Sequence, residues 1–187
     1  MSKEEIVDAA YAIHERDGIA GTSMRRVAAR VGITATALYR HFRDKEALLG
    51  AIADRGFEEF AAALRRAPVA SAPRTRVLQI LERYRELAIR RPDLFRLMFS
   101  TPREGLRRFP EDFAAHRSAV FDELRGAVER GIANGEFRRA SPLELSLSLW
   151  AQAHGLIALE EAGRFARDRR QFTALYRRLL RHSIGGL

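Results

Sequence analysis

The sequence predicts an all-α protein, and three observations support this fold class. Helix stops are marked by Gly18, Gly32 and the Asn134-Gly135 pair, which suit left-handed backbone. Alternating runs of β-branched residues, which would indicate strands, are missing. Helix starts are marked by a Ser or Thr followed three residues later by Glu, a capping-box pattern found at residues 2–5, 101–104 and 141–144.

These signals and the apolar periodicity between them place about nine helices along the chain. We expect them at residues 3–17, 23–31, 35–41, 44–66, 74–90, 92–100, 111–133, 142–162 and 169–183. Short helices and tight turns give way to long helices near residue 50. This change predicts an N-terminal three-helix domain at residues 1–46 and a helical C-terminal domain at residues 47–187, with a hinge from Pro68 to Pro73.

Composition excludes several classes of protein. The chain has 187 residues, of which 47% are hydrophobic and 30% charged, as in a folded globular protein. It has no cysteine, which excludes disulfide scaffolds and cysteine zinc sites, and we expect neither a metal nor a cofactor. Residues 1–5 lack the order of a signal peptide, and the apolar-rich run 145–159 is shorter than the roughly 20 residues a membrane span needs. We therefore expect a cytoplasmic protein with no membrane partner.

Residues 22–46 have the pattern of a helix-turn-helix. Thr22 or Ser23 can cap a first short helix, Gly32 permits the turn, and Thr34 can cap a second short helix. Such a unit needs a third helix to complete its core, and the apolar residues of the helix at 3–17 can supply it.

The second helix of this unit has the surface of a groove-reading helix. Small residues let the backbone approach the floor of a DNA groove, while Thr and Tyr offer hydrogen bonds to bases and phosphates. The residues that would face outward are Ala35, Thr36, Tyr39 and Arg40. The formal net charge of +9 alone locates no site, but residues 22–45 hold six basic and one acidic side chain, a local charge of +5. We therefore expect this helix to bind the major groove of double-stranded DNA.

The same segment resembles a known family. The run Gly-Ile-Thr-x-x-x-Leu-Tyr-Arg-His-Phe-Arg-Asp-Lys-Glu-Ala-Leu-Leu at residues 32–49 is similar to the signature of the tetracycline-repressor-like (TetR) transcription regulators of bacteria. Weaker likeness at 90–99, 131–138 and 149–156 resembles a C-terminal subgroup that has a Trp and a His-Gly pair. The resemblance implies a repressor that a small-molecule ligand releases from a palindromic operator.

The resemblance also implies roles for single residues. Phosphate-contacting positions match Thr22 or Ser23, Tyr39, His41 and Lys45, and positions near bases match Arg25, Ala35 and Thr36. With Thr34 and Arg40, these complete the predicted DNA-binding set. Tyr39 has an alternative role as an aromatic that closes the small core, and His41 as a helix-end residue. The chain departs from the family at His14, where a core Phe is usual, and at Ala35-Thr36, where a basic residue and Gly are common.

A ligand cavity in the C-terminal domain is a further implication of the resemblance. Arg117 falls on the same helical face as Phe113 in the predicted helix 111–133, so its guanidinium would need an acidic partner or an anionic ligand. Core packing is the alternative role for the aromatic and Met candidates, and internal pairing for the polar ones. The candidate ligand-binding residues are Tyr84, Phe95, Met98, Phe99, His116, Arg117, Phe121, Trp150 and His154.

Two apolar stripes on one helix predict a homodimer. The helix at 142–162 has apolar residues on two faces, and the core of one chain can cover only one of them. The alternative is a central helix enclosed within one subunit. Gly155 is the expected crossing point, and the final helix offers a complementary surface. The candidate interface residues are Leu145, Leu149, Gln152, Gly155, Leu156, Leu159, Phe172, Leu175 and Leu179.

Two other classes of function, an enzyme and a structural adaptor, have less support in the sequence than DNA binding. An enzyme has no support, because the chain lacks Gly-x-Ser-x-Gly, His-Glu-x-x-His and Gly-rich phosphate-loop motifs, and we expect no catalytic residues. A purely structural helical adaptor would not require the dense basic and polar surface of residues 22–45.

Overall fold

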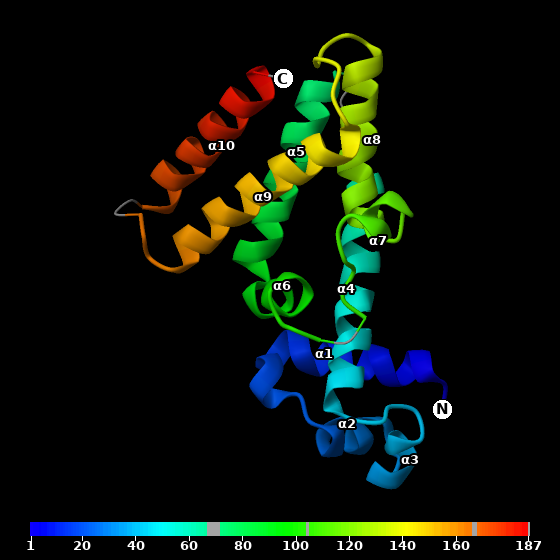
Figure 1. Ribbon diagram of the computed structural model, residues 1–187. Coiled ribbons are helices and arrows are strands. Elements are labelled where there is room, and N and C mark those ends of the chain that lie inside the picture. The colour runs from blue at the N-terminus through cyan, green and yellow to red at the C-terminus, as the bar shows by residue number, and fades with distance from the viewer. Residues whose placement is uncertain (67–71, 104, 166–167, 187) are drawn as a thin grey trace. The chain divides into compact units, whose positions relative to one another are not determined.

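The structure is a computed structural model that describes residues 1–66, 72–103, 105–165 and 168–186 (Figure 1). These residues form ten α-helices and no strand, which confirms the predicted fold class. The predicted hinge from Pro68 lies largely outside the described residues. The helices are α1 (Lys3–Gly21), α2 (Met24–Val31), α3 (Ala35–Tyr39), α4 (Lys45–Arg66), α5 (Pro73–Arg90), α6 (Pro92–Phe99), α7 (Glu111–Ala114), α8 (Ala119–Ala133), α9 (Pro142–Glu161) and α10 (Arg169–Gly185).

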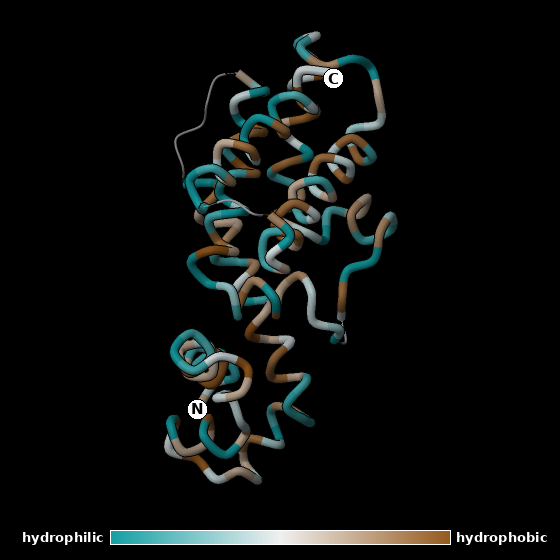
Figure 2. The backbone as a smooth tube through the Cα atoms, turned by 90° about the vertical axis from the view of Figure 1, so that its left-hand side faces the viewer, coloured by the Kyte–Doolittle hydropathy of each residue, from teal (hydrophilic) through white to brown (hydrophobic). Residues whose placement is uncertain are grey.

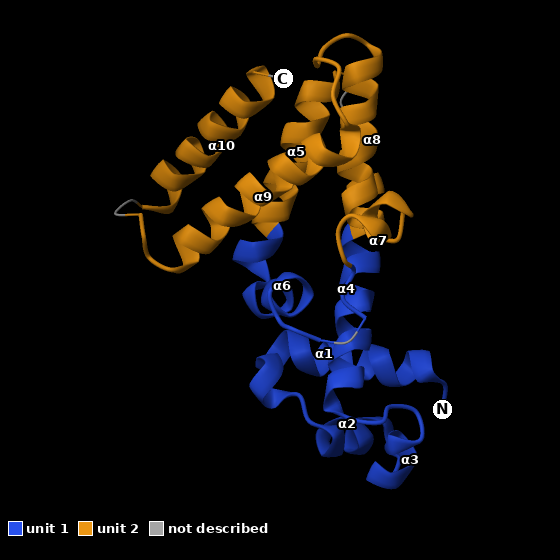
Figure 3. Cartoon of the chain, viewed as in Figure 1, with its two compact units in different colours: residues 1–60, 87–107 blue, residues 61–86, 108–187 orange. Residues whose placement is uncertain are grey.

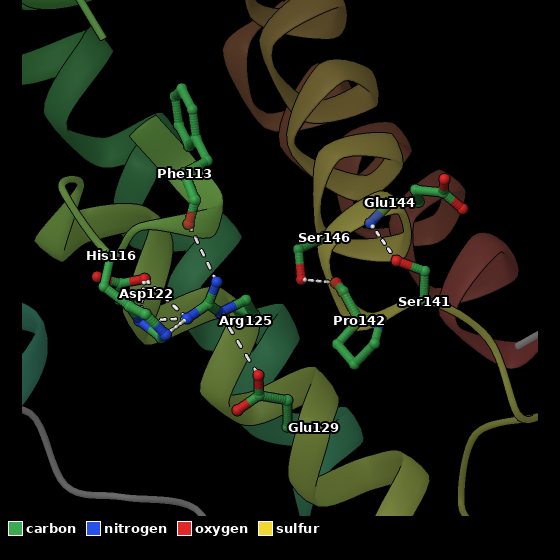
Figure 4. Close-up of polar contacts among 9 residues, drawn as sticks. All are labelled: Phe113, His116, Asp122, Arg125, Glu129, Ser141, Pro142, Glu144 and Ser146. Atoms are coloured by element: carbon green, nitrogen blue, oxygen red, sulfur yellow. Dashed lines mark hydrogen bonds and ion pairs between the residues drawn. The ribbon is translucent and has the colours of Figure 1, made fainter. Parts of the chain in front are cut away.

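Local capping chemistry sets several helix ends where the sequence predicts them. Ser2 Oγ accepts a hydrogen bond from the Glu5 backbone N–H at 3.1 Å, and the Glu5 carboxylate accepts one from the Ser2 N–H at 2.7 Å, which completes a capping box. Ser141 Oγ accepts from the Glu144 N–H at 3.4 Å at the start of α9 (Figure 4). Gly32 has φ 73° and ends α2, as its left-handed preference predicts.

Three predicted boundaries are wrong. Gly18 has φ 64° but kinks α1 instead of ending it, and the helix continues to Gly21. No helix begins after Thr101, because residues 101–103 and 105–110 are turns and irregular chain. The helix expected at 111–133 is interrupted between α7 and α8, where His116 adopts φ 55° and its ring contacts Asp122 and Arg125 (Figure 4).

The chain divides into two compact units (Figure 3). Unit 1 comprises residues 1–60 and 87–107, and unit 2 comprises residues 61–86 and 108–187. Hydrophobic and hydrophilic segments alternate along the helices of both units (Figure 2). The two units are defined by which residues pack together, whereas the boundary at residue 46 separates a DNA-binding domain from a C-terminal domain by function. That functional boundary stays a prediction.

Unit 1 is built around the contacts of α1 with α2 and α6 and of α2 with α3. Its core holds apolar side chains that are at most 5% exposed, among them Ile6, Ile13, Val27, Leu38 and Phe42. Burying them ties the two short helices, which would be marginal alone, to the longer α1. The core therefore fixes which side of α3 remains open to solvent.

Unit 2 is held together by buried polar anchors as well as apolar packing. Tyr176 on α10 is 1% exposed and donates its hydroxyl hydrogen bond to the Leu81 carbonyl of α5 at 2.8 Å. Arg85, also on α5 and 6% exposed, donates to Glu160 on α9 at 2.9 Å and to Thr173 on α10 at 3.0 Å. These contacts join α9 and α10 to α5 within one chain.

A buried histidine makes unit 1 sensitive to acid. His14 on α1 is 1% exposed, and neither ring nitrogen has a hydrogen-bond partner among the described residues. Burial lowers the pKa of His14 below its ordinary value. The Asp93 backbone and the charges of Glu15 and Asp93 act in the opposite direction, and the Arg91 charge acts with burial. The unfolded chain therefore takes up this proton more readily, so the stability is present above the ordinary pKa of 6.5 and is lost as pH falls through it.

We expect His14→Phe to flatten this dependence, because a Phe ring has nothing to protonate. From about pH 7.5 to about pH 5.5, the free energy of unfolding of the wild type should fall by up to about 1.4 kcal/mol more than that of the variant. Urea unfolding at one protein concentration measures this difference. His182→Gln, at an exposed histidine of α10, is the control. Equal losses in the wild type and His14→Phe would contradict the buried neutral histidine.

A glycine contact in unit 2 gives a second stability prediction. A Cβ at Gly131 of α8 would overlap the ring of Phe137, whereas a Cβ at Gly126 of the same helix would meet only the end of the Arg130 side chain, at 3.5 Å. Gly131→Ala should therefore lower the free energy of unfolding by about 1 kcal/mol through overpacking. Gly126→Ala, its matched control, should be neutral or stabilising. Equal effects in urea unfolding would contradict the close packing of Phe137 on α8.

Candidate nucleic-acid interface

The helix-turn-helix predicted at residues 22–46 is present. Ser23 Oγ accepts from the Arg26 N–H at 3.3 Å and begins α2, and Thr34 Oγ1 accepts from the Ala37 N–H at 3.1 Å and begins α3. Gly32 supplies the left-handed turn between the two helices. Short-range chemistry therefore sets where α2 and α3 begin and where the chain turns between them, and the two helices pack against each other.

The outer surface of α3 is open to solvent. Leu38 is fully buried and Phe42 is 3% exposed, and these two side chains fix the inward side. Tyr39 is 52% exposed, which excludes its alternative role as a core aromatic. The predicted DNA-binding residues that the structure leaves exposed are Arg25, Thr34, Ala35, Thr36, Tyr39, Arg40 and His41.

Two predicted phosphate contacts have other partners. Thr22 is fully buried and its Oγ1 donates to the Gly18 carbonyl at 2.8 Å, so its side chain has no surface to offer a phosphate. Lys45 is half-buried, and its Nζ donates to the Ile19 carbonyl at 3.2 Å. Of the two residues predicted to cap α2, the N-cap is Ser23.

The basic side chains of α2 and α3 differ in how they are paired. Arg26 lies 2.5 Å from the Asp17 carboxylate and donates to the Gly21 carbonyl. Hydrogen bonds from Arg16 and Arg26 lower the pKa of Asp17 to about 2, so that carboxylate stays ionised beside both guanidiniums. Arg25 and Arg40 are exposed and form no ion pair within the described part of the chain. Their positive charge is therefore available to a polyanion.

A polar cluster in unit 1 joins α1, α4 and the residue that precedes α6. Arg91, which precedes α6, pairs with Glu15 of α1 at 2.7 Å and with Glu59 of α4 at 3.3 Å, and it also contacts the Tyr11 hydroxyl. Tyr11 in turn donates to Glu59. Burial is the largest effect that raises the pKa of Tyr11, so the phenol stays protonated. These residues come from α1, from α4 and from the residue that precedes α6, which are far apart in sequence, and no local motif marks them.

The predicted ligand-binding residues do not all lie in one unit. Phe95 and Met98 are buried and Phe99 is half-buried in unit 1, and the other six belong to unit 2. The expected burial of Arg117 is wrong, because its side chain is 70% exposed; it pairs with Asp112 at 3.0 Å, which is the internal pairing given as its alternative role. His116 is likewise a surface residue, with a side chain 65% exposed. Both errors follow from the break between α7 and α8, which removes the helical face assumed for Arg117.

Four of the remaining candidates form an aromatic cluster in unit 2. The Tyr84 hydroxyl lies 2.7 Å from His154 Nδ1, and the Trp150 ring lies 6.0 Å from Phe121 and 6.4 Å from His154. Burial raises the pKa of Tyr84 and lowers the pKa of His154. The hydrogen-bonded pair is therefore uncharged at neutral pH.

The candidate dimer residues separate into two groups. Leu145, Leu149 and Phe172 are at most 8% exposed and lie in the core of their own chain, so the prediction that they face a partner is corrected. Leu145 and Leu149 lie on the buried side of α9 with Ala153 and Ile157, and α9 packs on α8 and α10 (Figure 1). The candidates with some exposure are Gln152, Gly155, Leu156, Leu159, Leu175 and Leu179.

Metal sites and membrane spans are absent from the described ranges. No group of three or more His, Asp or Glu side chains there can hold a metal ion. None of the described helices is long and apolar enough to cross a membrane.

The all-helical fold and its solvent-facing α3 define a helix-turn-helix regulator. Residues 6–52 match the family model for bacterial regulatory proteins of the tetR family, and residues 77–183 match that for the tetracyclin repressor-like C-terminal domain. The chain belongs to the tetR family of transcriptional regulators. Like other members of this family, it is classed with regulators and not with enzymes.

Relatives and solved structures agree with this family. The HTH-type transcriptional regulator Rv1816 of Mycobacterium tuberculosis is 25% identical over 179 residues, covering 81% of this chain and 76% of that protein. A protein of unknown function from Rhodococcus sp. RHA1 has a similar structure, with a TM-score of 0.73, 26% identity and coverage of 96% of this chain and 93% of that one. BioQ, solved with its double-stranded DNA operator, gives a TM-score of 0.63 at 25% identity and covers 100% and 99% of the two chains.

Proposed function

We propose that this protein is a sequence-specific repressor that binds a palindromic operator as a homodimer and is released from it by a small-molecule ligand. The observation that carries the proposal is the exposed face of α3, which presents small and hydrogen-bonding residues, together with the exposed cations Arg25 of α2 and Arg40, which form no ion pair with any described residue. The likeness to BioQ, whose structure contains its operator, supports this interpretation. A DNA-binding regulator of this kind acts in the bacterial cytoplasm.

Selection of genomic DNA fragments with the purified protein tests the proposal. We expect enrichment of an inverted repeat whose half-sites are about 34–36 Å apart or a multiple of that distance, because each half-site takes one α3. Recovery of fragments without a shared inverted repeat, even at low salt, would contradict sequence-specific binding by a dimer.

We place ligand control in the C-terminal part of the chain, beyond residue 46. A ligand lowers operator affinity only by the difference between its affinities for the DNA-binding state and for a state with displaced recognition helices. Helix α4 begins beside the helix-turn-helix in sequence and belongs in part to both units, so we propose that it carries the movement. We also propose that the chain belongs to the C-terminal subgroup that has a Trp and a His-Gly pair, because it contains Trp150 and the His154-Gly155 pair.

The aromatic cluster of unit 2 favours binding of an uncharged part of a ligand. Tyr84 and His154 present a neutral hydroxyl and a neutral imidazole to a ligand. The other two polar candidates, His116 and Arg117, lie at the surface and do not belong to this cluster. Tyr84, Phe121, Trp150 and His154 are therefore proposed to contact an apolar part or a hydrogen-bonding group of a ligand.

A further inference from the structure

A basic groove opens between two helices of unit 1. Helices α1 and α2 pack against each other (Figure 1), and the groove between them has a volume of about 490 Å³. The residues that line it are Ala12, Ile13, Arg16, Arg26, Ala29 and Arg30. Three of these six are arginines and none is acidic, so the groove attracts an anion.

The three arginines differ in whether the chain offsets their charge. Arg16 and Arg26 share the carboxylate of Asp17, at 2.9 Å and 2.5 Å. Arg30 is exposed, and its side chain forms neither an ion pair nor a hydrogen bond within the described part of the chain. Three guanidiniums and one carboxylate leave a net charge of +2 at the groove. The N–H donors of Arg30 are all available to a ligand.

The groove borders the side of α2 that carries Arg25. Residues four apart lie on one face of a helix, so Ala29 lies one turn after Arg25, and Arg30 lies one turn after Arg26. Ala29 also lines the groove. The family resemblance implies that Arg25 lies near the bases of an operator. The groove is therefore next to the surface that we propose binds DNA.

The shape and lining of the groove favour a strand of DNA over a small molecule. Sites for small molecules enclose most of the ligand and are lined largely by apolar and aromatic side chains. Here five of the six lining residues are exposed, only Ile13 is buried, and none of the six is aromatic. A planar guanidinium can bind a phosphate through two parallel hydrogen bonds. An open groove lined by arginines therefore suits a DNA strand that passes over it and places one phosphate at Arg30.

We propose that this groove binds a backbone phosphate of the operator that α3 does not contact, and that Arg30 is the residue that holds it. Arg16 and Arg26, which Asp17 holds in place, add positive charge around the same phosphate. The proposal rests on the function proposed above, because α3 has to bring a duplex to this face. It extends the DNA interface from α3 and the first turn of α2 to the end of α2 and to α1.

Arg30→Ala should lower the salt dependence of operator binding. Each phosphate contact contributes about −0.9 to the slope of log affinity against log salt, so a fourfold fall in salt strengthens each contact about 3.5-fold. A dimer has two grooves, so a fall from about 200 mM to about 50 mM salt should strengthen binding by the wild type about 12-fold more than binding by Arg30→Ala. Arg30→Lys keeps the charge and should keep the slope. Arg90→Ala is the control, at an exposed arginine of α5 that lies in unit 1 and has no ion-pair partner among the described residues.

Operators with a single neutral backbone position locate the contact. Replacing one phosphate at a time with an uncharged methylphosphonate removes one charge and leaves the bases in place. Measured by electrophoretic mobility shift, the wild type should lose affinity at one phosphate of each half-site at which Arg30→Ala loses none. The two proteins should respond alike at every other position. The position that distinguishes them must occur in both halves of the inverted repeat, because a twofold axis relates the two subunits of the dimer.

Two other roles for Arg30 give different results, and either result would overturn the proposal. Arg30 lies in the last turn of α2, where a cation can stabilise the helix end. If that is its whole role, Arg30→Ala unfolds at a lower urea concentration but keeps the salt slope and the methylphosphonate profile of the wild type. The other role is binding of a free phosphorylated molecule. Calorimetry with inorganic pyrophosphate would then show binding that Arg30→Ala loses, with operator binding unchanged.

The groove contact and the proposed function can fail separately. If the wild type selects an inverted repeat and Arg30→Ala matches it in salt slope and methylphosphonate profile, the groove contact alone fails. If no inverted repeat is recovered, the proposed function fails. The salt slope on a duplex of random sequence then still tests the groove, because phosphate contacts do not depend on sequence. A lower slope for Arg30→Ala on that duplex would support the phosphate site, and an equal slope would overturn it.

Discussion

Leu159→Glu is expected to convert the protein from a dimer to a monomer and to weaken operator binding at least about 100-fold. Leu159 is 47% exposed on α9, so a charge there does not disturb the core of the chain. Beside it along the helix are the exposed Ala151 and Ala158 and the half-exposed Gly155. A Cβ at Gly155 would meet nothing within 4 Å, so the chain itself leaves this surface open for a second helix.

The size of the expected effect follows from linking two half-site contacts. In a dimer the second α3 binds at a high effective concentration, and separating the subunits removes an advantage of about 100- to 10,000-fold without changing either contact. Light scattering should give the variant a mass near the 21.2 kDa of one chain and the wild type twice that mass. Electrophoretic mobility shift with the selected operator then measures the loss of affinity.

A matched control separates the interface from general effects of surface charge. Leu106→Glu introduces the same charge at a leucine of unit 1 that is 42% exposed, and it should remain dimeric with unchanged operator affinity. Circular dichroism should show the helical content of the wild type in both variants. A wild type of one-chain mass, or a Leu159→Glu dimer with full affinity, would contradict the proposed interface.

The sequence predicts those features of this fold that depend on interactions between residues close together in the chain. Ser2 caps α1, Thr34 caps α3 and Gly32 ends α2 because each needs only a hydrogen bond or a backbone preference within four residues. The capping-box pattern at Thr101 has the same residue types and starts no helix. There the chain instead carries Arg103 to α4, a contact between segments about 50 residues apart that no local pattern contains.

The same distinction applies to helix faces. Both stripes of α9 are apolar in sequence, and only the packing of α8 and α10 decides that Leu145 and Leu149 face the core. In the candidate DNA-binding site, the outward face of α3 follows from Leu38 and Phe42, which are local to it. The buried position of Thr22 follows from the kink at Gly18, whose carbonyl accepts its hydroxyl. Periodicity thus identifies which residues are apolar, and tertiary packing decides how each face is used.

Arg25→Ala and Arg40→Ala are expected to weaken DNA binding in different ways. Both residues are exposed arginines without an ion-pair partner in the described part of the chain, so the two substitutions remove the same charge. Arg25 lies in the first turn of α2, and the family resemblance implies a position near the bases; Arg40 follows the last residue of α3. We propose that Arg25 reads a base edge and that Arg40 contacts the phosphate backbone.

A base contact and a phosphate contact leave different signatures. Arg25→Ala should lose about 1–3 kcal/mol of discrimination at one base-pair position of each half-site, because a bidentate arginine distinguishes guanine from the other bases. Arg40→Ala should weaken binding to all sequences alike and reduce the slope of log affinity against log salt by about one phosphate per subunit. Arg138→Ala, at an exposed arginine of unit 2, should do neither.

Binding measured against a set of operators with single base-pair changes, at several salt concentrations, tests this division. A uniform loss for both variants would assign Arg25 to the backbone and leave specificity to Ala35, Thr36 and the shape of the DNA. That outcome would be consistent with operator binding but would contradict a base-reading role for Arg25, because α3 alone would then contact the bases. A loss at one position for Arg25→Ala, absent in Arg40→Ala, would show that α2 as well as α3 reads sequence.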